Sequence, residues 1–376
     1  MAMTEGIQEL IGLSQKYGQS SDWVQAGGGN TSLKHGTGIS IKRSGIRLTD
    51  IHSEEDLISV SVATPEILDL LNGAPEILEK KYDTLIQTRF NPSAGRPSIE
   101  LSFHTMGYRY TVHTHPTLIN LFGCSREGQT WLKEHADFHQ SLCVPYCKPG
   151  ILLTHAMWQE LQVHQISCHP HTTILLNHGL VITGDSPEVI DHETLRVLNQ
   201  LLRNCWYEPM PLDIQNDSLS TLPLPEWGSH LIDLLDSSLV MHPIQHPFLR
   251  ECDASLLDDT FNNPGVVYPD AVVYIGKGIL VLENVQKESL KEKLSSFFQT
   301  YHHRPKIVWA EGLFYTLTAS LREASFVEDV FLNHLRVLWL IRKNLWNPCY
   351  LSEEQMNELL NWDAEKYRQQ LSRVSS

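Results

Sequence analysis

The chain has 376 residues, of which 41% are hydrophobic and 19% charged. These fractions are typical of globular proteins and exclude a disordered chain, and the length indicates two domains or one domain with a large extension. The net charge of −15 argues against DNA or RNA as a partner, because an acidic surface repels phosphate backbones. A local basic pocket for one small phosphate is compatible with this charge.

The sequence predicts a cytoplasmic protein without a membrane partner. The N-terminus lacks the charged-then-apolar pattern of a signal peptide, and no apolar run reaches the roughly 18 residues that span a membrane. The seven cysteines are scattered and odd in number, which is typical of free thiols in a reducing compartment. Cys143, Cys147 and Cys168, the last followed by two histidines, match no common zinc spacing, so we interpret them as ordinary buried thiols.

Short helices and strands alternate through the first 205 residues. The spacing of apolar residues predicts helices at 5–17, within 66–78, at 98–107, around 154–161 and at 187–202. Strands are expected around 39–42 and at 110–115, 174–176 and 180–183. This alternation indicates an α/β or α+β fold.

The composition changes between Trp206 and Trp227, where prolines and polar residues accumulate. We therefore predict a catalytic domain at 1–205, a proline-rich linker at 206–226 and an α/β extension at 227–376. Within the extension the pattern predicts a hairpin of 271–275 and 279–282, a helix at 288–301, strands at 306–309 and 312–318, and a helix at 320–340.

The most informative segment is Thr111-Val112-His113-Thr114-His115-Pro116. Side chains of a strand alternate between its faces, so His113 and His115 share one face, about 7 Å apart along the strand. Both rings can then bind one divalent ion at metal–nitrogen distances of roughly 2.0–2.1 Å. An H-x-H pair alone is weak support, because two such histidines are often only half-exposed or hydrogen-bonded.

Two further motifs strengthen the prediction of a metal site. Asn177-His178-Gly179 follows an apolar run and supplies a third imidazole, and Pro97-Ser98-Ile99-Glu100 supplies a carboxylate. Three histidines and a carboxylate are the composition of an open catalytic site for zinc or another divalent ion. Such an ion polarises a carbonyl, and Glu100 is then the candidate acid/base.

Two loops can bind an anion. The loop Gly27-Gly28-Gly29-Asn30-Thr31-Ser32 offers backbone N–H groups and short polar side chains for a phosphate or carboxylate, and Ser44-Gly45 offers the same on a smaller scale. The candidates in these loops are Gly29, Asn30, Thr31, Ser44 and Gly45. Lys42 and Arg43 add positive charge, which favours an anion but would equally fit a solvated surface.

Together these motifs resemble the class II aldolase/adducin family in order and spacing, over about residues 5–205. The triple-glycine loop and Arg96-Pro97-Ser98-Ile99-Glu100 resemble most the aldolase half of bifunctional rhamnulose-phosphate aldolase/lactaldehyde dehydrogenase proteins. Three C-terminal pieces are similar to the same half: Tyr268-Pro269-Asp270, Ala310-Glu311-Gly312-Leu313 and Trp362-Asp363-Ala364-Glu365-Lys366.

The resemblance implies a three-layer α/β/α sandwich around a mostly antiparallel sheet, with the C-terminal extension added to it. It implies a homo-oligomer, usually a tetramer with active sites between subunits. It also implies that His113, His115 and His178 bind zinc or a similar ion, that Glu100 is the acid/base, and that the substrate phosphate binds at four positions: Asn30, Ser44, Gly45 and Ser98. Departures are Ile99, where the family often has a second serine, and the acidic Glu311.

Three functions stay open at this point. The first is a metal-dependent aldolase that cleaves a ketose 1-phosphate to dihydroxyacetone phosphate and an aldehyde through a metal-stabilised enediolate. The second keeps the site but carries out 4-epimerisation, dehydration or decarboxylation of a sugar phosphate. The third is a non-enzymatic, adducin-like interaction module, which predicts loss of the ligands. Because the three histidines and Glu100 are all present, we favour an enzyme.

Overall fold

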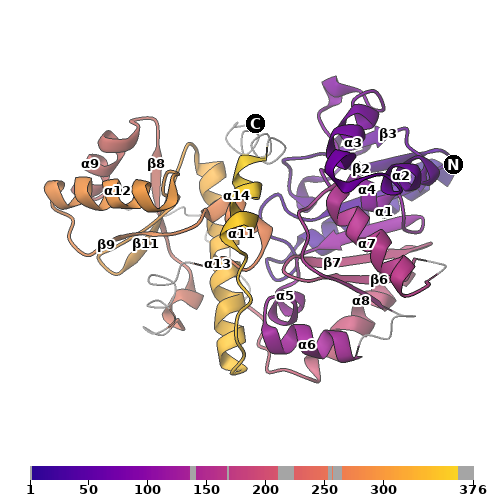
Figure 1. Cartoon of the computed structure of the whole chain (residues 1–376). Helices are drawn as coiled ribbons and strands as arrows, with labels where there is room; N and C mark the ends of the chain where they lie inside the picture. Colours follow the sequence, from indigo (N-terminus) through magenta and orange to yellow (C-terminus); the bar gives the residue numbers. More distant parts are fainter. Residues whose placement is uncertain are drawn as a thin grey trace. The chain divides into compact units, whose positions relative to one another are not determined.

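The structure, a computed structural model, describes residues 2–135, 141–166, 169–210, 224–252, 256 and 265–362. The chain divides into an N-terminal unit, Met1–Tyr207 with Leu340–Cys349, and a C-terminal unit, Glu208–Trp339 with Tyr350–Ser376 (Figure 1). The predicted domain limits at 205 and 226 stay predictions. Of the predicted linker, residues 211–223 lie outside the described residues, as do residues 363–366 of the last C-terminal motif.

A seven-stranded sheet forms the centre of the N-terminal unit. Its strands are β1 (Asn30–His35), β2 (Gly38–Lys42), β3 (Leu57–Val60), β4 (Tyr110–Thr114), β5 (Ser141–Val144), β6 (Thr172–Leu175) and β7 (Gly179–Gly184). They lie in the order β3-β2-β1-β4-β7-β6-β5. Strands β5 and β6 pair in parallel, and the other neighbours in this order pair antiparallel.

Helices cover both faces of this sheet (Figure 1). They are α1 (Ala2–Gly18), α2 (Thr64–Leu71), α3 (Leu78–Ile86), α4 (Leu101–His104), α5 (Thr117–Gly123), α6 (Arg126–His135), α7 (Ile151–Val163) and α8 (Pro187–Leu202). Helices α1 and α8 contact each other and strands β1, β4 and β7. Helices α2, α3 and α7 bury an apolar cluster with Ile39 and Ile41 of β2. The unit is therefore the predicted three-layer sandwich around a mostly antiparallel sheet.

The register of the strands decides which face each site residue occupies. Ser32 of β1 lies opposite Ile41 of β2, and Asn30 of β1 lies opposite His113 of β4. Cross-strand partners share a face of the sheet, so Asn30, Ser32 and His113 lie on the face that α2, α3 and α7 cover. The intervening Thr31 points to the other face, where its hydroxyl meets that of Ser14 in α1 at 2.6 Å.

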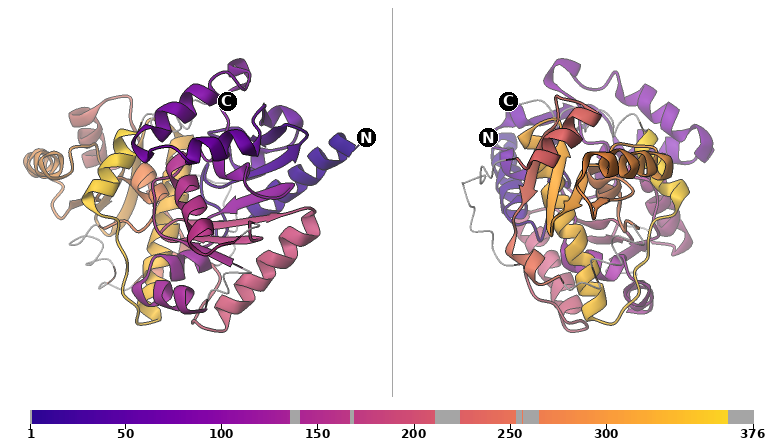
Figure 2. Two further views of the ribbon diagram at one scale, coloured as in Figure 1. Left: turned by 45° about the vertical axis from the view of Figure 1, so that its right-hand side comes forward. Right: turned by 90° about the vertical axis from the view of Figure 1, so that its left-hand side faces the viewer.

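The C-terminal unit contains a second sheet, in the order β8-β11-β10-β9. Its elements are β8 (Val240–Ile244), β9 (Leu280–Leu282), β10 (Ile307–Ala310), β11 (Leu313–Thr318), α9 (Glu226–Leu235), α11 (Pro269–Ile275), α12 (Lys287–Tyr301), α14 (Glu353–Asn361) and α13 (Leu321–Lys343), of which residues from Leu340 on are counted with the N-terminal unit. Helices α9 and α12 share an apolar cluster with this sheet, and Figure 2 shows the ribbon of this unit from two further sides. Phe331 of α13 packs on Phe314 of β11, with ring centroids 4.9 Å apart.

Two expectations about local structure are wrong. Residues 271–275 form helix α11 rather than the first strand of a hairpin, and β9 instead pairs in parallel with β10. Pro269 stands in the first turn of that helix and its residues are buried, and a short, fully buried apolar run has no periodicity that separates helix from strand. Residues 30–32, expected in a loop, begin strand β1.

Short 3-10 helices connect several of these elements, at Leu48–Asp50, Glu54–Asp56, Pro75–Ile77, Pro92–Ala94 and Pro247–Arg250. Among the helices of the described stretches, none combines the length and apolar character needed to cross a membrane.

Candidate metal centre

The fold brings the three predicted metal ligands together. His113 lies near the end of β4, His115 directly follows that strand, and His178 lies in the turn between β6 and β7. One ring nitrogen of each lies within 4.8 Å of those of the other two, and the Nε2 atoms of His113 and His115 are 3.0 Å apart. All three side chains are buried. The geometry is that of rings directed at one common point.

Gly179 allows β7 to approach this point. A Cβ atom at this position would lie 2.4 Å from the Thr114 carbonyl oxygen and 2.9 Å from Cδ2 of His115. Both distances are shorter than a van der Waals contact permits. Glycine therefore follows His178 because any larger residue would push the turn away from the other two histidines.

Nε2 of His113 is the unprotonated ring nitrogen and faces the cluster. Its Nδ1 lies 2.9 Å from the Leu180 carbonyl oxygen, which can only accept a hydrogen bond, so Nδ1 carries the proton and Nε2 keeps its lone pair. Burial lowers the pKa of His113 to about 3, against the raising effect of Glu100. The ring is therefore neutral near pH 7, the form that binds a metal ion.

Glu100 lies against the histidine cluster at the start of α4. Its Oε2 is 3.3 Å from Nε2 of His113, and its Oε1 is 3.2 Å from Nε2 of His178. Burial acts to raise the pKa of this carboxyl group, but the positive charge that the neighbouring histidines, His113 first, carry when protonated outweighs that effect and the pKa is lowered. Where these rings are neutral, the buried negative charge of Glu100 is stable only beside another cation, such as a bound metal ion.

The residues present fit a divalent ion. Three imidazoles converge beside an ionised carboxylate, a donor set that suits zinc and leaves one position open for a substrate. Among the described residues this is the one group of three or more histidine, cysteine or acidic side chains with metal-binding spacing. Cys168 of the alternative cysteine set lies outside those residues. The cluster could therefore hold a metal, in keeping with the sequence prediction.

His104 is a site residue that the sequence analysis missed. Asn30 donates from Nδ2 to Oε2 of Glu100 at 2.8 Å, and its Oδ1 accepts a hydrogen bond from Nε2 of His104. Nδ1 of His104 then accepts from the Ser32 hydroxyl at 2.7 Å. Burial lowers the pKa of His104 to about 3, although Glu100 acts to raise it. A neutral histidine thus fixes the amide that holds Glu100.

One signal in the sequence could have found His104. It stands four residues after Glu100, one helical turn along α4. A lone histidine between apolar residues is more often a core residue. The spacing therefore indicates a site residue only when Glu100 is already known to belong to the site.

Lys42 joins the two predicted anion-binding loops. Its ammonium group donates to the carbonyl oxygens of Gly27 at 2.8 Å and Ile46 at 2.7 Å, and the side chain is 2% exposed. The backbone N–H of Ser98 donates to the Lys42 carbonyl at 3.1 Å. Lys42 is therefore not a solvated surface charge. Its buried ammonium group connects the backbone of the two loops.

The predicted phosphate-binding residues differ in where they lie relative to Glu100. Asn30 contacts Glu100 directly, and the Ser98 hydroxyl accepts from the Glu100 N–H at 3.3 Å. Gly29 lies beside β4, where a Cβ would be 2.8 Å from the His113 carbonyl oxygen. Ser44 and Gly45 follow β2 and are joined to the next segment by a 2.9 Å bond from Ser44 N to the Arg96 carbonyl. Thr31 faces α1 instead, and all these roles stay predictions.

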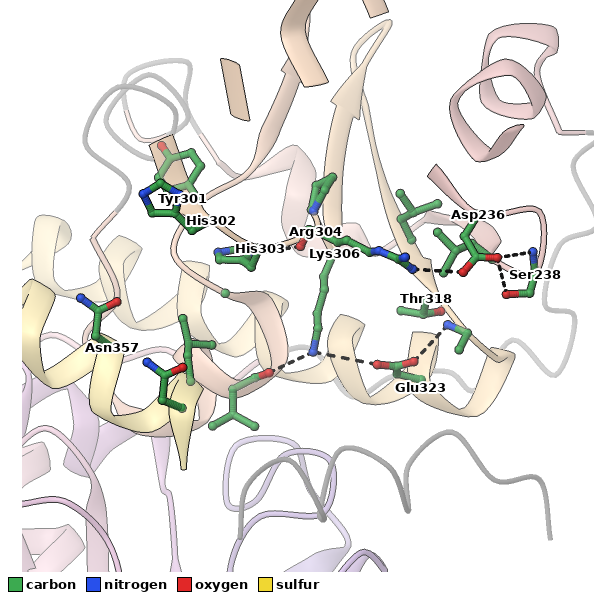
Figure 3. A pocket seen from close by; sticks show the side chains of 18 residues that line it. Asp236, Ser238, Tyr301, His302, His303, Arg304, Lys306, Thr318, Glu323 and Asn357 are labelled. Atoms are coloured by element: carbon green, nitrogen blue, oxygen red, sulfur yellow. Dashed lines mark hydrogen bonds and ion pairs between the residues drawn. The ribbon is translucent and has the colours of Figure 1, made fainter. Parts of the chain in front are cut away.

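A separate cavity of about 530 Å³ lies within the C-terminal unit (Figure 3). Its charged groups face one another, with Arg304 3.1 Å from Asp236 and Lys306 3.9 Å from Glu323. Glu311, the acidic departure from the related proteins, accepts a hydrogen bond from the indole of Trp227 at 3.0 Å. These groups have partners within the unit, so the histidine cluster is the better candidate for chemistry.

Comparison with known proteins indicates the family of the N-terminal part of the chain. The sequence model of the class II aldolase and adducin N-terminal domain matches residues 8–193. The uncharacterized oxidoreductase YuxG of Bacillus subtilis is 26% identical over 297 residues, which are 72% of this chain and 41% of that protein. The chain thus spans well under half the length of this relative.

Two solved structures match about half of the chain. The N-terminal class II aldolase domain of a Thermoplasma acidophilum protein is 20% identical, with a TM-score of 0.42, and the match covers 52% of this chain and 92% of that one. An L-fuculose 1-phosphate aldolase is 18% identical, with a TM-score of 0.35 and coverage of 56% and 91%. On the match of the family's own sequence model, residues 8–193 of this chain belong to the class II aldolase and adducin family.

Proposed function

We propose that this protein is a zinc-dependent aldolase that cleaves a ketose 1-phosphate to dihydroxyacetone phosphate and an aldehyde. The observation that carries the proposal is the position of Glu100. Its carboxylate is buried, ionised and 3.2–3.3 Å from two imidazoles of the cluster. An adducin-like binding module has no need of this arrangement, because a buried charge lowers stability unless it is compensated.

The reaction needs a Lewis acid and a proton carrier. A divalent ion at the three imidazoles would polarise the substrate carbonyl and so favour breaking the adjacent carbon–carbon bond. Glu100 has two carboxylate oxygens at the same place and can accept and return the proton of the substrate hydroxyl or alpha carbon. Asn30 holds the carboxylate in position, so that the proton moves to and from a fixed atom.

The neighbouring backbone suits the phosphate of such a substrate. Gly29, Ser44, Gly45 and Ser98 belong to segments that hydrogen bonds of Lys42 and Ser44 tie together beside Glu100. Backbone N–H groups and small hydroxyls in such turns bind phosphate oxygens without a large side chain in between. We expect the phosphate to bind there, and Thr31 to contribute only through its place in β1.

A screen of ketose 1-phosphates tests the proposal. The zinc-loaded protein should release dihydroxyacetone phosphate from one of them, as a coupled dehydrogenase assay measures. The Glu100→Gln variant is the matched control, because it keeps size and polarity but has no carboxylate to carry a proton. It should retain the metal and lose turnover by a factor of about 10²–10⁴, the usual contribution of a general acid/base.

Two results would contradict the proposal. Turnover that survives in Glu100→Gln would remove the role of Glu100. Absence of dihydroxyacetone phosphate from every ketose 1-phosphate, together with a changed sugar phosphate in the same tubes, would replace aldol cleavage by epimerisation, dehydration or decarboxylation at the same site. Product analysis by NMR distinguishes these reactions.

A further inference from the structure

The third histidine of the cluster is held differently from the first. His113 donates from Nδ1 to the Leu180 carbonyl, the usual way in which a protein fixes a metal-binding imidazole. Nδ1 of His178 is buried and has no hydrogen-bond partner among the described residues. Apart from the 3.2 Å contact of its Nε2 with Glu100, the ring is positioned by its own backbone, in the turn between β6 and β7.

That backbone depends on Asn177, the residue before it. Asn177 has a φ of 53°, in the left-handed region that costs a non-glycine residue of order 1–3 kcal/mol and persists only where neighbours enforce it. Three hydrogen bonds do so: its N–H donates to the Gly123 carbonyl at 3.0 Å, its Oδ1 accepts from Gln129 at 2.9 Å, and its Nδ2 donates to the Cys349 carbonyl at 2.7 Å.

The last of these partners comes from a segment far along the chain. Residues 346–349 follow α13 and belong to the N-terminal unit. The N–H of Cys349 donates to the Cys124 carbonyl at 2.7 Å, and Ser125 and Pro348 form an antiparallel bridge. The segment thus pairs with the backbone between α5 and α6, which itself leads to Gly123 and Gln129.

A side-chain clamp fixes this segment at its other end. The Glu127 carboxylate of α6 accepts from the N–H of Asn347 and from its side-chain amide, both at 2.7 Å. The N–H of Arg126 donates to the Asn347 carbonyl at 2.8 Å, and Trp346 packs on Phe122 with ring centroids 5.0 Å apart. Together these contacts set the position of the Cys349 carbonyl relative to Asn177.

We propose that residues 346–349 are a brace for the metal centre, which positions His178 through the amide of Asn177. The inference rests on the proposed metal site, and it gives this part of the C-terminal sequence a role in metal binding without contact with the metal. Asn177 and Glu127 are positioning residues in this scheme. Groups that orient metal ligands typically contribute 10- to 100-fold to metal affinity.

Asn177→Asp cuts one contact of the brace. The aspartate keeps an acceptor for Gln129 but presents an oxygen, instead of an N–H donor, to the Cys349 carbonyl. We expect the dissociation constant for Zn²⁺, measured by competition with a chromophoric chelator, to rise about 10- to 100-fold. The d–d absorption of bound Co²⁺ should also weaken or shift as the third nitrogen ligand moves. Asn204→Asp makes the same change two residues after the end of α8, where the side-chain amide donates to the Gln200 carbonyl, and should leave both readouts unchanged.

Glu127→Ala tests the other end of the brace, at a partly exposed position where it removes both hydrogen bonds to Asn347. It should raise the Zn²⁺ dissociation constant about 3- to 10-fold. The effect should be smaller than that of Asn177→Asp because Glu127 acts on His178 only through residues 347–349 and Asn177. Glu134→Ala removes an exposed charge from the same helix α6 and serves as the matched control. His113→Ala, which removes a ligand, sets the lower limit of affinity.

Thermal unfolding separates positioning from a general structural role. A brace variant should melt close to the wild-type temperature when metal-free and lose the stabilisation that Zn²⁺ adds, since bound ligand stabilises in proportion to its affinity. Equal lowering of both melting temperatures, with unchanged Zn²⁺ affinity in Asn177→Asp and Glu127→Ala, overturns the brace. Wild-type protein that binds neither Zn²⁺ nor Co²⁺ overturns the metal site itself, so the two failures are distinguishable.

Discussion

At the scale of single residues, the buried carboxylate of Glu100 depends on a chain of neutral partners. Asn30 holds Glu100, His104 holds Asn30, and Ser32 holds His104. Each of these side chains is buried, so the loss of any one of them leaves a buried polar atom of its neighbour without a hydrogen-bond partner. This series of hydrogen bonds also determines the orientation of the Asn30 amide, because an ionised carboxylate can only accept and so must face the N–H side of the amide.

His104→Leu should therefore lower the free energy of unfolding by about 1–3 kcal/mol, the cost of a buried acceptor without a donor. His104→Gln should recover part of this loss, because its amide nitrogen reaches near the position of the ring Nε2. Urea unfolding followed by tryptophan fluorescence measures both variants. Equal stability of the leucine and glutamine variants would refute the hydrogen bond to Asn30 as the cause.

At the scale of elements, the site is assembled by close approach of strands. The pairing of β1 with β4 puts Asn30 opposite His113, and Gly29 and Gly179 leave room where backbone meets the histidine segment. A Cβ at Gly179 has two neighbours within 3 Å, one of them a carbonyl oxygen of the paired strand. The first neighbour is backbone and the second is a ring atom of His115, so the paired strands would have to separate and the His115 ring would have to move.

Gly179→Ala should destabilise the protein by about 1–3 kcal/mol, as expected for overpacking, and should weaken Zn²⁺ binding because His115 is displaced. Gly12→Ala is the control: it lies on α1 with nothing within 4 Å of its Cβ. In a helix this change should stabilise by roughly 0.5–1 kcal/mol. Urea unfolding midpoints compare the two, and similar shifts for both variants would contradict the steric argument.

At the scale of the whole molecule, buried neutral histidines make both units sensitive to acid. Burial lowers the pKa of His104 in the N-terminal unit to about 3 and that of His334 in the C-terminal unit to about 4, from 6.5. Between those values and 6.5 the unfolded chain binds protons that the folded chain excludes. The free energy of unfolding therefore falls as the pH is lowered through this range.

We expect the urea midpoint of the metal-free protein to be lower at pH 5 than at pH 7.5. One such histidine contributes a loss of about 2 kcal/mol at pH 5. His334→Leu removes one titrating group at a position where Nε2 has no hydrogen-bond partner among the described residues, so its midpoint should depend less on pH. A pH dependence equal to that of the wild type would contradict the assignment.

Much of the fold was predictable because it depends on local patterns. Apolar spacing located α1, α8, α12 and α13, and the alternation of helices and strands indicated the fold class. Residues 271–275 were assigned wrongly because they are buried on all sides, so their sequence carries no period. The environment of α11 is formed by distant parts of the chain, and no local window contains it.

The sequence by itself determined which residues are candidates for the site: motif spacing and family resemblance pointed to His113, His115 and His178 as metal ligands and to Glu100 as the acid/base, and the structure brings these four side chains together. Only the tertiary structure decided how they are held. His104 matters because β1 and α4 meet, Thr31 turns away because strand faces alternate, and Cys349 reaches Asn177 from 172 residues away. Composition and spacing act locally, whereas hydrogen-bond partners are chosen by packing, which joins residues that no sequence pattern connects.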